Sequence, residues 1–87
     1  MNNVKRIKIM LDKIIDVKEF CTLADKYPNL DLVTGKYRVA ATSLMGIFSL
    51  DLTNPVKLEY PEEYHDDVIK DFKKWIVEEW KMLFYNC

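Results

Sequence analysis

The chain has 87 residues, and its 13 Lys and Arg residues and 14 Asp and Glu residues give a formal net charge of −1. This length fits one domain spanning residues 1–87, and the near-neutral charge argues against direct nucleic-acid binding, which needs a basic surface. Hydrophobic residues make up 49% of the chain, too many for a disordered protein. One His and two Cys cannot supply the four ligands of a structural zinc site, and we expect no metal or cofactor.

The N-terminal segment alternates polar and apolar residues and lacks the continuous apolar stretch of a signal peptide. Nowhere does the sequence contain about 18 consecutive uncharged apolar residues, so we expect no membrane span and a cytoplasmic protein. Cys21 and Cys87 are expected to be free thiols, with Cys21 buried on a helix stripe and Cys87 at a frayed end.

The first strand is predicted over residues 4–11, because apolar and polar residues alternate there. Asp16 and Glu19 have the spacing of a capping box and predict a helix start. Apolar residues then recur at three and four positions as far as Tyr27, and Pro28 ends the helix.

Residues 30–33 and 37–41 predict a hairpin around a turn at Gly35, which can take positive φ. Ser43 has the position of an N-cap before a second, short and densely apolar helix. A fourth strand is predicted over residues 56–60. The apolar spacing of a third helix follows from Pro61 to Leu83, with Trp75 in the core. The order β-α-β-β-α-β-α predicts one α+β domain.

This order, together with the run Thr42–Leu50, resembles the HPr phosphocarriers of the bacterial sugar phosphotransferase system. That family carries Ser-(Ile/Leu)-Met-Gly-(hydrophobic)-(Met/Phe)-Ser-Leu at the start of its short second helix, and the run here reads TSLMGIFSL. The resemblance implies an open-faced β-sandwich, in which three helices cover one side of a four-stranded antiparallel sheet of order 1-4-2-3. The alternating strands and the single apolar stripe of each helix require a similar arrangement.

The resemblance also implies a phosphorylatable His, followed by Ala-Arg-Pro, at the start of the first helix. The matching region of this chain contains Asp12, Lys13, Ile14 and Asp16 and has no His. Two Asp side chains would repel an incoming phosphate. The region is therefore expected to be a degenerate phosphoacceptor, with phosphoryl transfer through it lost.

Ser43 matches the regulatory serine that a dedicated kinase phosphorylates in HPr of Gram-positive bacteria. A phosphate at this position would meet unpaired helix amides and the positive end of the helix dipole. Its simpler role is that of an N-cap alone.

By the same correspondence, Leu44, Met45 and Phe48 would form an exposed apolar patch on which enzymes and a transcription repressor dock. Ile47, Leu50 and Leu52 would face the core. Six apolar residues on a helix of two to three turns cannot all point inward, which favours an exposed patch, although all three patch residues could be core.

His65, the single histidine, is placed near the start of the third helix, at the opposite end of the sheet from residues 12–16. We expect it to be exposed to solvent and not to accept phosphate. The acidic residues around it are interpreted as a complement to the helix dipole and not as a metal site: Glu62, Glu63, Asp66 and Asp67.

The C-terminal segment is unusually apolar because it contains Trp80, Met82, Phe84 and Tyr85. It either packs back across the helices or supplies a homodimer contact, and we favour packing within the chain. The expected state is a monomer or weak homodimer.

The leading hypothesis is a non-catalytic HPr-like regulatory or adaptor protein whose partners are proteins, such as HPr kinase, a transcription regulator or phosphotransferase-system enzymes. The alternative is a divergent phosphocarrier that uses Asp12, Asp16 or His65. An enzyme is not supported, because the sequence shows no nucleophile–base pair, phosphate-binding glycine loop or metal constellation. The remaining hypothesis is a domain that keeps this fold for an unrelated contact.

Overall fold

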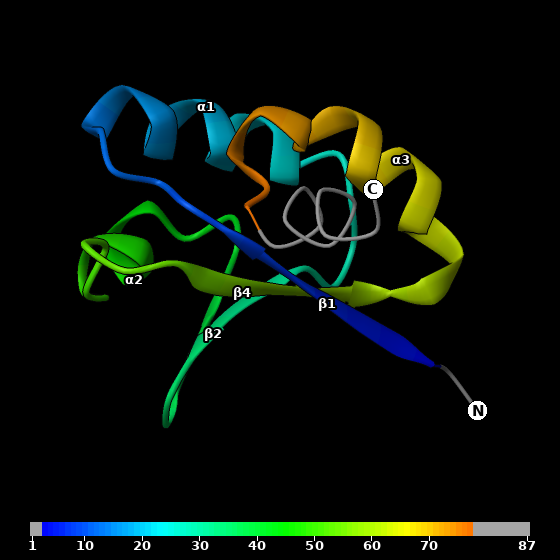
Figure 1. Ribbon diagram of the computed structural model, residues 1–87, viewed down its shortest axis with the longest axis horizontal. Helices are drawn as coiled ribbons and strands as arrows, with labels where there is room; N and C mark the ends of the chain where they lie inside the picture. Colours follow the sequence, from blue (N-terminus) through cyan, green and yellow to red (C-terminus); the bar gives the residue numbers. More distant parts are fainter. Residues whose placement is uncertain (1–2, 78–87) are drawn as a thin grey trace, which may run out of the picture.

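The computed structural model describes residues 3–77, which form a four-stranded antiparallel sheet and three helices (Figure 1). The strands are β1 (Val4–Ile9), β2 (Asp31–Thr34), β3 (Tyr37–Ala40) and β4 (Val56–Pro61), and their order in the sheet is β1-β4-β2-β3. The helices are α1 (Ile14–Ala24), α2 (Leu44–Phe48) and α3 (His65–Asp71). Two short 3-10 helices, η1 (Glu62–Tyr64) and η2 (Lys73–Trp75), flank α3. The predicted α+β class and strand order 1-4-2-3 are confirmed.

The hydrophobic core lies between the sheet and the helices. Each strand except β3 contributes fully or nearly fully buried apolar side chains that point toward the helices. The buried side chains of α1 and α3 lie on the side of each helix that faces the sheet. Figure 1 shows α1 and α3 lying along the same face of the sheet. Alternation along the strands therefore leaves the opposite face to polar and charged side chains.

The pairing of β1 with β4 fixes the two ends of the sheet. Val4 lies opposite Pro61 and Ile9 lies opposite Val56, so the chain leaves β1 toward α1 at one end and leaves β4 toward α3 at the other. His65, which follows Pro61 closely, is therefore at the opposite end from residues 12–16. This separation agrees with the prediction.

The predicted capping box at the start of the first helix is wrong. The amide of Val17 already donates to the carbonyl of Lys13 at 3.1 Å, so the helix begins at Ile14 and Lys13 is its N-cap, without a side-chain hydrogen bond. Asp16 instead lies in the first turn, where a carboxylate suits the positive end of the helix dipole. Glu19 accepts a hydrogen bond from Lys74 Nζ at 2.9 Å.

The third helix is shorter than its apolar spacing predicted. α3 ends at Asp71, and after η2 the chain becomes extended and pairs with the edge of β1 through a bridge between Ile76 and Ile9. The amide of Met10 donates to the carbonyl of Trp75 at 2.8 Å. This backbone pairing satisfies polar groups at the edge of β1 that a longer third helix would leave unpaired. The predicted burial of Trp75 is confirmed.

Helical periodicity beyond residue 77 lies outside the described residues. The same holds for the expectations about Cys87 and the apolar C-terminal side chains of Trp80, Met82, Phe84 and Tyr85.

Candidate docking surface at the second helix

Ser43 is the N-cap of α2. Its backbone is extended (φ −94°, ψ 98°), and its Oγ accepts a hydrogen bond from the amide of Gly46 at 3.1 Å. The Ser43 carbonyl accepts from the amide of Ile47 at 2.9 Å. A serine cap of this kind stabilises a helix by about 1 kcal/mol relative to alanine. The predicted capping role is confirmed, and phosphorylation of this hydroxyl stays a prediction.

Gly46 allows α2 to lie close to β3. A Cβ atom at this position would be 2.9 Å from Ser43 Oγ and 3.2 Å from Val39 Cβ. A side chain here would therefore push against both the cap and the edge strand. The packing of α2 on β3 thus depends on a residue whose role the sequence analysis did not identify.

The apolar side chains around α2 divide between the core and the surface. Ile47 and Leu50 are buried, whereas 81% of Met45 and 41% of Phe48 is exposed. Leu44 is half-buried and packs against the core, so it is less exposed than the other two residues of the predicted patch. Only five residues are helical, and Leu50 and Leu52 follow the helix.

The start of α1 adds two more exposed apolar side chains, because Ile14 is 66% exposed and Ile15 is 60% exposed. α1 and α2 are in contact, and the start of α1 and the whole of α2 lie at the same end of the molecule in Figure 1. Four of the six large hydrophobic side chains exposed among the described residues thus belong to these two elements. We call Ile14, Ile15, Met45 and Phe48 the α1–α2 apolar surface.

The sequence analysis treated Ile14 only as part of a degenerate phosphoacceptor region and did not consider Ile15. The helical spacing in the sequence could have predicted that both isoleucines are exposed. α1 buries the stripe formed by Val17, Phe20 and Ala24, and neither isoleucine falls on it. A large apolar residue off that stripe is expected to face solvent.

The region predicted to be a degenerate phosphoacceptor lies at the α1 N-terminus. Asp12, Lys13 and Ile14 are exposed, and Asp16 is half-buried. None of these side chains carries an imidazole, which is the nucleophile that an HPr-type transfer would need.

His65 is not the exposed side chain that the sequence suggested. It is half-buried, its Nδ1 lies 2.7 Å from the Tyr60 hydroxyl oxygen, and its ring stacks on the Tyr60 ring with centroids 5.8 Å apart. Tyr60 is buried at the end of β4 and holds the imidazole in place. These contacts give His65 a packing role at the sheet end distant from α2.

The acidic residues near His65 are exposed in the first turns of η1 and α3, as expected for a dipole complement. Among residues 3–77, no group of three or more His, Cys, Asp and Glu side chains is arranged to hold a metal ion.

Cys21 is half-buried, and not fully buried as predicted, and it packs against the core. Burial raises the pKa of its thiol, which keeps the sulfur in its less reactive protonated form at neutral pH.

A scan against protein-family models gave no match to this chain, and neither did searches of curated proteins and of solved structures. No helix in the described part of the chain is long and apolar enough to cross a membrane. The family resemblance of the Thr42–Leu50 run stays a prediction.

Proposed function

We propose that the chain is a non-catalytic, HPr-like regulatory or adaptor protein of the bacterial phosphotransferase system, acting in the cytoplasm. It binds partner proteins through the α1–α2 apolar surface. The observation that supports this most directly is the exposure of Met45 and Phe48 on a helix that contains no charged residue and is capped by Ser43.

The side chains of this surface are chemically suited to protein binding. Met45 is flexible and polarisable and adapts to different partner surfaces, while Phe48 offers a rigid aromatic anchor. Exposed apolar side chains gathered at one end of a small protein are typical of an interaction site. A loss of the phosphoacceptor His fits an adaptor, because such a protein needs the surface and not the transfer chemistry.

Ser43 supplies a means of regulation. Ser43 lies at the edge of this surface and is half-buried. A phosphate would add a charge of about −1.5 to −2 next to apolar contacts and would present new acceptors to the first amides of α2. Phosphorylation would therefore change which partners the surface accepts.

We expect pull-down from source cells to lose the same partners when Met45→Ala or Phe48→Ala replaces the original chain. Val4→Ala is the matched control, since Val4 is 57% exposed but lies on β1 at the other end of the sheet. Quantitative mass spectrometry of the bound proteins measures the result. Identical partner lists for the original chain and all three variants would show that this surface is not the docking site.

We expect HPr kinase and ATP to place one phosphate on Ser43. Intact-mass measurement and peptide mapping detect it. Ser43→Ala and Ser49→Ala are paired controls because Ser49, whose hydroxyl donates to the Gly46 carbonyl at 2.6 Å, lies at the other end of the same helix. A phosphate that survives Ser43→Ala, or no phosphate at all, contradicts the switch.

Incubation with phosphoenolpyruvate and Enzyme I, followed by the same mass measurement, tests the alternative of a divergent carrier. We expect no acid-labile adduct. An adduct on Asp12, Asp16 or His65 would support the carrier instead of the adaptor.

A further inference from the structure

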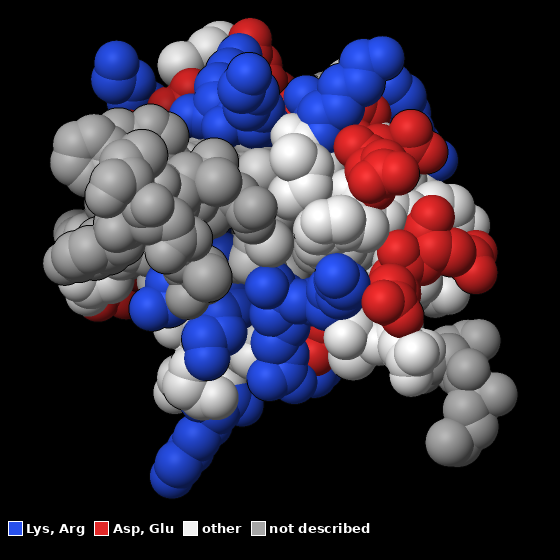
Figure 2. Space-filling model, turned by 45° about the vertical axis from the view of Figure 1, so that its right-hand side comes forward, with Lys and Arg blue, Asp and Glu red and all other residues white. Residues whose placement is uncertain are grey.

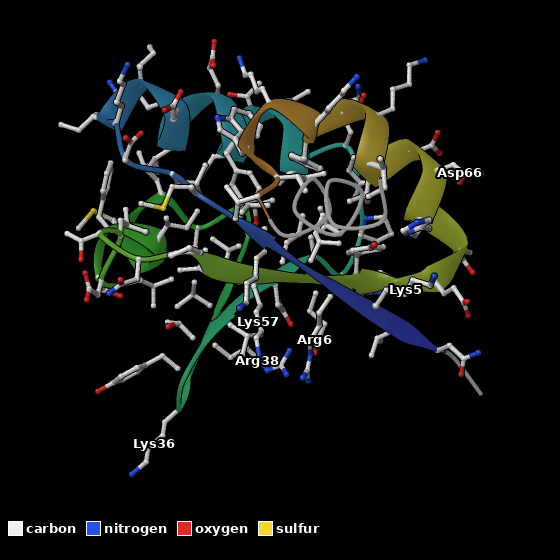
Figure 3. The ribbon with its side chains drawn as sticks, in the orientation of Figure 1. Lys5, Arg6, Lys36, Arg38, Lys57 and Asp66 are labelled. Atoms are coloured by element: carbon white, nitrogen blue, oxygen red, sulfur yellow. The ribbon has the colours of Figure 1, made fainter. Side chains whose placement is uncertain are left out.

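The face of the sheet opposite α1 and α3 carries a concentration of positive charge. Arg6, Arg38 and Lys57 project from it in Figure 3, and Lys36 extends beyond it from the tip of the β2–β3 hairpin. Figure 2 shows Lys and Arg side chains both along the top and in the lower half of its view, while a group of Asp and Glu lies at the right. The cations in the lower half of this view therefore lie apart from the acidic group at the right.

The strand register arranges these charges in two rows that cross the sheet. One row runs Arg6, Glu59, Asp31 and Ala40 from β1 to β3. The neighbouring row runs Lys8, Lys57, Val33 and Arg38 and contains three cations and no carboxylate.

The first row is neutralised by two arginines. Arg6 Nε donates to Glu59 Oε2 at 2.7 Å. Arg38 Nη1 donates to Glu59 Oε1 at 2.5 Å and to Asp31 Oδ2 at 2.9 Å. Two guanidinium groups thus balance two carboxylates. After these ion pairs are counted, the positive charge that remains on this face of the sheet is that of the two lysines of the second row.

Lys8 and Lys57 are directly opposite each other on adjacent strands, and both are exposed. Neither forms an ion pair with a carboxylate among the described residues. Like charges in directly opposite positions destabilise a sheet, so this pair has an energetic cost that a bound anion would remove.

The two lysines line a hollow of about 430 Å³ on this face. Arg6 and Arg38 border the same hollow, and Thr34 and Gly35 close it at the hairpin end. A volume of this size lies within the range of about 300–1,000 Å³ that is usual for small-molecule sites. The hollow therefore has both the charge and the room for a small anionic ligand.

We propose that this hollow binds the phosphate group of a small phosphorylated molecule. A phosphomonoester carries about −1.5 to −2 charges at neutral pH, which matches the two lysines that form no ion pair within residues 3–77. Ammonium groups bind phosphate as point charges, and the nearby guanidinium groups offer further donors. The site is separate from the α1–α2 apolar surface and does not depend on the proposed adaptor role.

Other anionic partners fit the hollow less well. Single-stranded nucleic acid is held largely by aromatic stacking, and none of the residues described as lining the hollow is aromatic. An acidic peptide would bind along a groove longer than this hollow of about 430 Å³, which the hairpin and Pro55 help to line. Both partners become arms of the experiment.

The test is a titration of the ¹⁵N-labelled protein with AMP at constant ionic strength, followed by amide chemical shifts. We expect saturable shifts centred on Lys8, Thr34, Gly35 and Lys57, weaker binding of inorganic phosphate at the same amides, and no shifts with adenosine. Lys8→Gln and Lys57→Gln should each weaken AMP binding by about tenfold. Lys18→Gln is the charge-matched control, because Lys18 is an exposed lysine of α1.

Each contrary result overturns the proposal in a different way. Equal shifts with adenosine would show that the phosphate is not recognised. An equal loss of affinity in Lys18→Gln would show that only net charge matters. Tighter binding of tetraglutamate or an oligouridylate at these amides would assign the hollow to another partner, and no shifts at millimolar AMP would remove the site. Each lysine variant removes a like-charge pair, so a cooperative thermal unfolding transition at or above that of the original chain shows that the fold is intact.

Discussion

Replacing Phe72 by Ala is expected to lower the free energy of unfolding by about 3–5 kcal/mol. Phe72 is fully buried at the C-cap of α3, and its ring centroid lies 5.1 Å from that of Phe20 and 6.0 Å from that of Trp75. It joins α1 to the turn through which the chain returns to β1. Truncation removes both apolar burial and ring contacts and leaves a cavity between these elements. Urea denaturation followed by Trp fluorescence and far-UV circular dichroism measures the loss.

Phe48→Ala is the matched control for this prediction. It makes the same substitution at a ring that is 41% exposed, so we expect a loss below about 1 kcal/mol. Phe72→Leu keeps an apolar side chain in the core and should have an intermediate effect, which makes the prediction measurable if Phe72→Ala does not fold. Equal losses at positions 48 and 72 would contradict the assignment of Phe48 to the surface.

Glu59→Gln is expected to lower the free energy of unfolding by about 1–2 kcal/mol at neutral pH. The Glu59 side chain is 12% exposed and is held between Arg6 and Arg38, which are 50% and 48% exposed. Gln has the same shape but loses the charge that strengthens these hydrogen bonds. The solvent exposure of both arginines limits the effect. Glu63→Gln removes the same charge from an exposed position on η1 and should change stability by less than about 0.5 kcal/mol.

The effect of Glu59→Gln should depend on pH. Hydrogen bonds from Arg38 are the largest cause lowering the pKa of Glu59 below its ordinary value of 4.5, with Arg6 adding to them and partial burial opposing them. A carboxyl whose pKa is lowered by folding contributes stability above its unfolded pKa, and that contribution is lost as pH falls through the folded pKa. The stability difference between the original chain and Glu59→Gln should therefore be largest near neutral pH and shrink below pH 4.5. A difference that stays constant into the acid range would contradict this account.

Local sequence patterns predicted the helices and strands whose bounds are set by residues close together in the sequence. Alternation located β1, β2, β3 and β4 to within two residues at each end, and the Ser43 cap located α2, because strand period and cap chemistry are read over short distances. The end of the third helix was mispredicted for the opposite reason. Phe72 and Trp75 keep helical spacing, but backbone pairing of Ile76 with β1, far away in the sequence, takes the chain out of the helix.

The same distinction applies to the candidate sites. The run around Ser43 predicted the exposure of Met45 and Phe48, since too many apolar residues were present for one buried side. Helical phase could have predicted that Ile15 is exposed, but its place beside the α2 residues and the partial burial of Leu44 depend on the contact between α1 and α2. The His65–Tyr60 contact likewise depends on how the chain turns at the end of β4.

The sequence by itself determined the fold class, because periodicity is a local property. The strand order 1-4-2-3 was an implication of the resemblance to the HPr phosphocarriers, and the strand pairing confirms it. A net charge of −1 argued against a basic surface. Only the tertiary structure placed Lys8 opposite Lys57 and paired Glu59 with two arginines, since strand register decides which charges become neighbours. Net charge is a sum over the chain and carries no information about that arrangement, so a nearly neutral protein can present a positively charged hollow on one face.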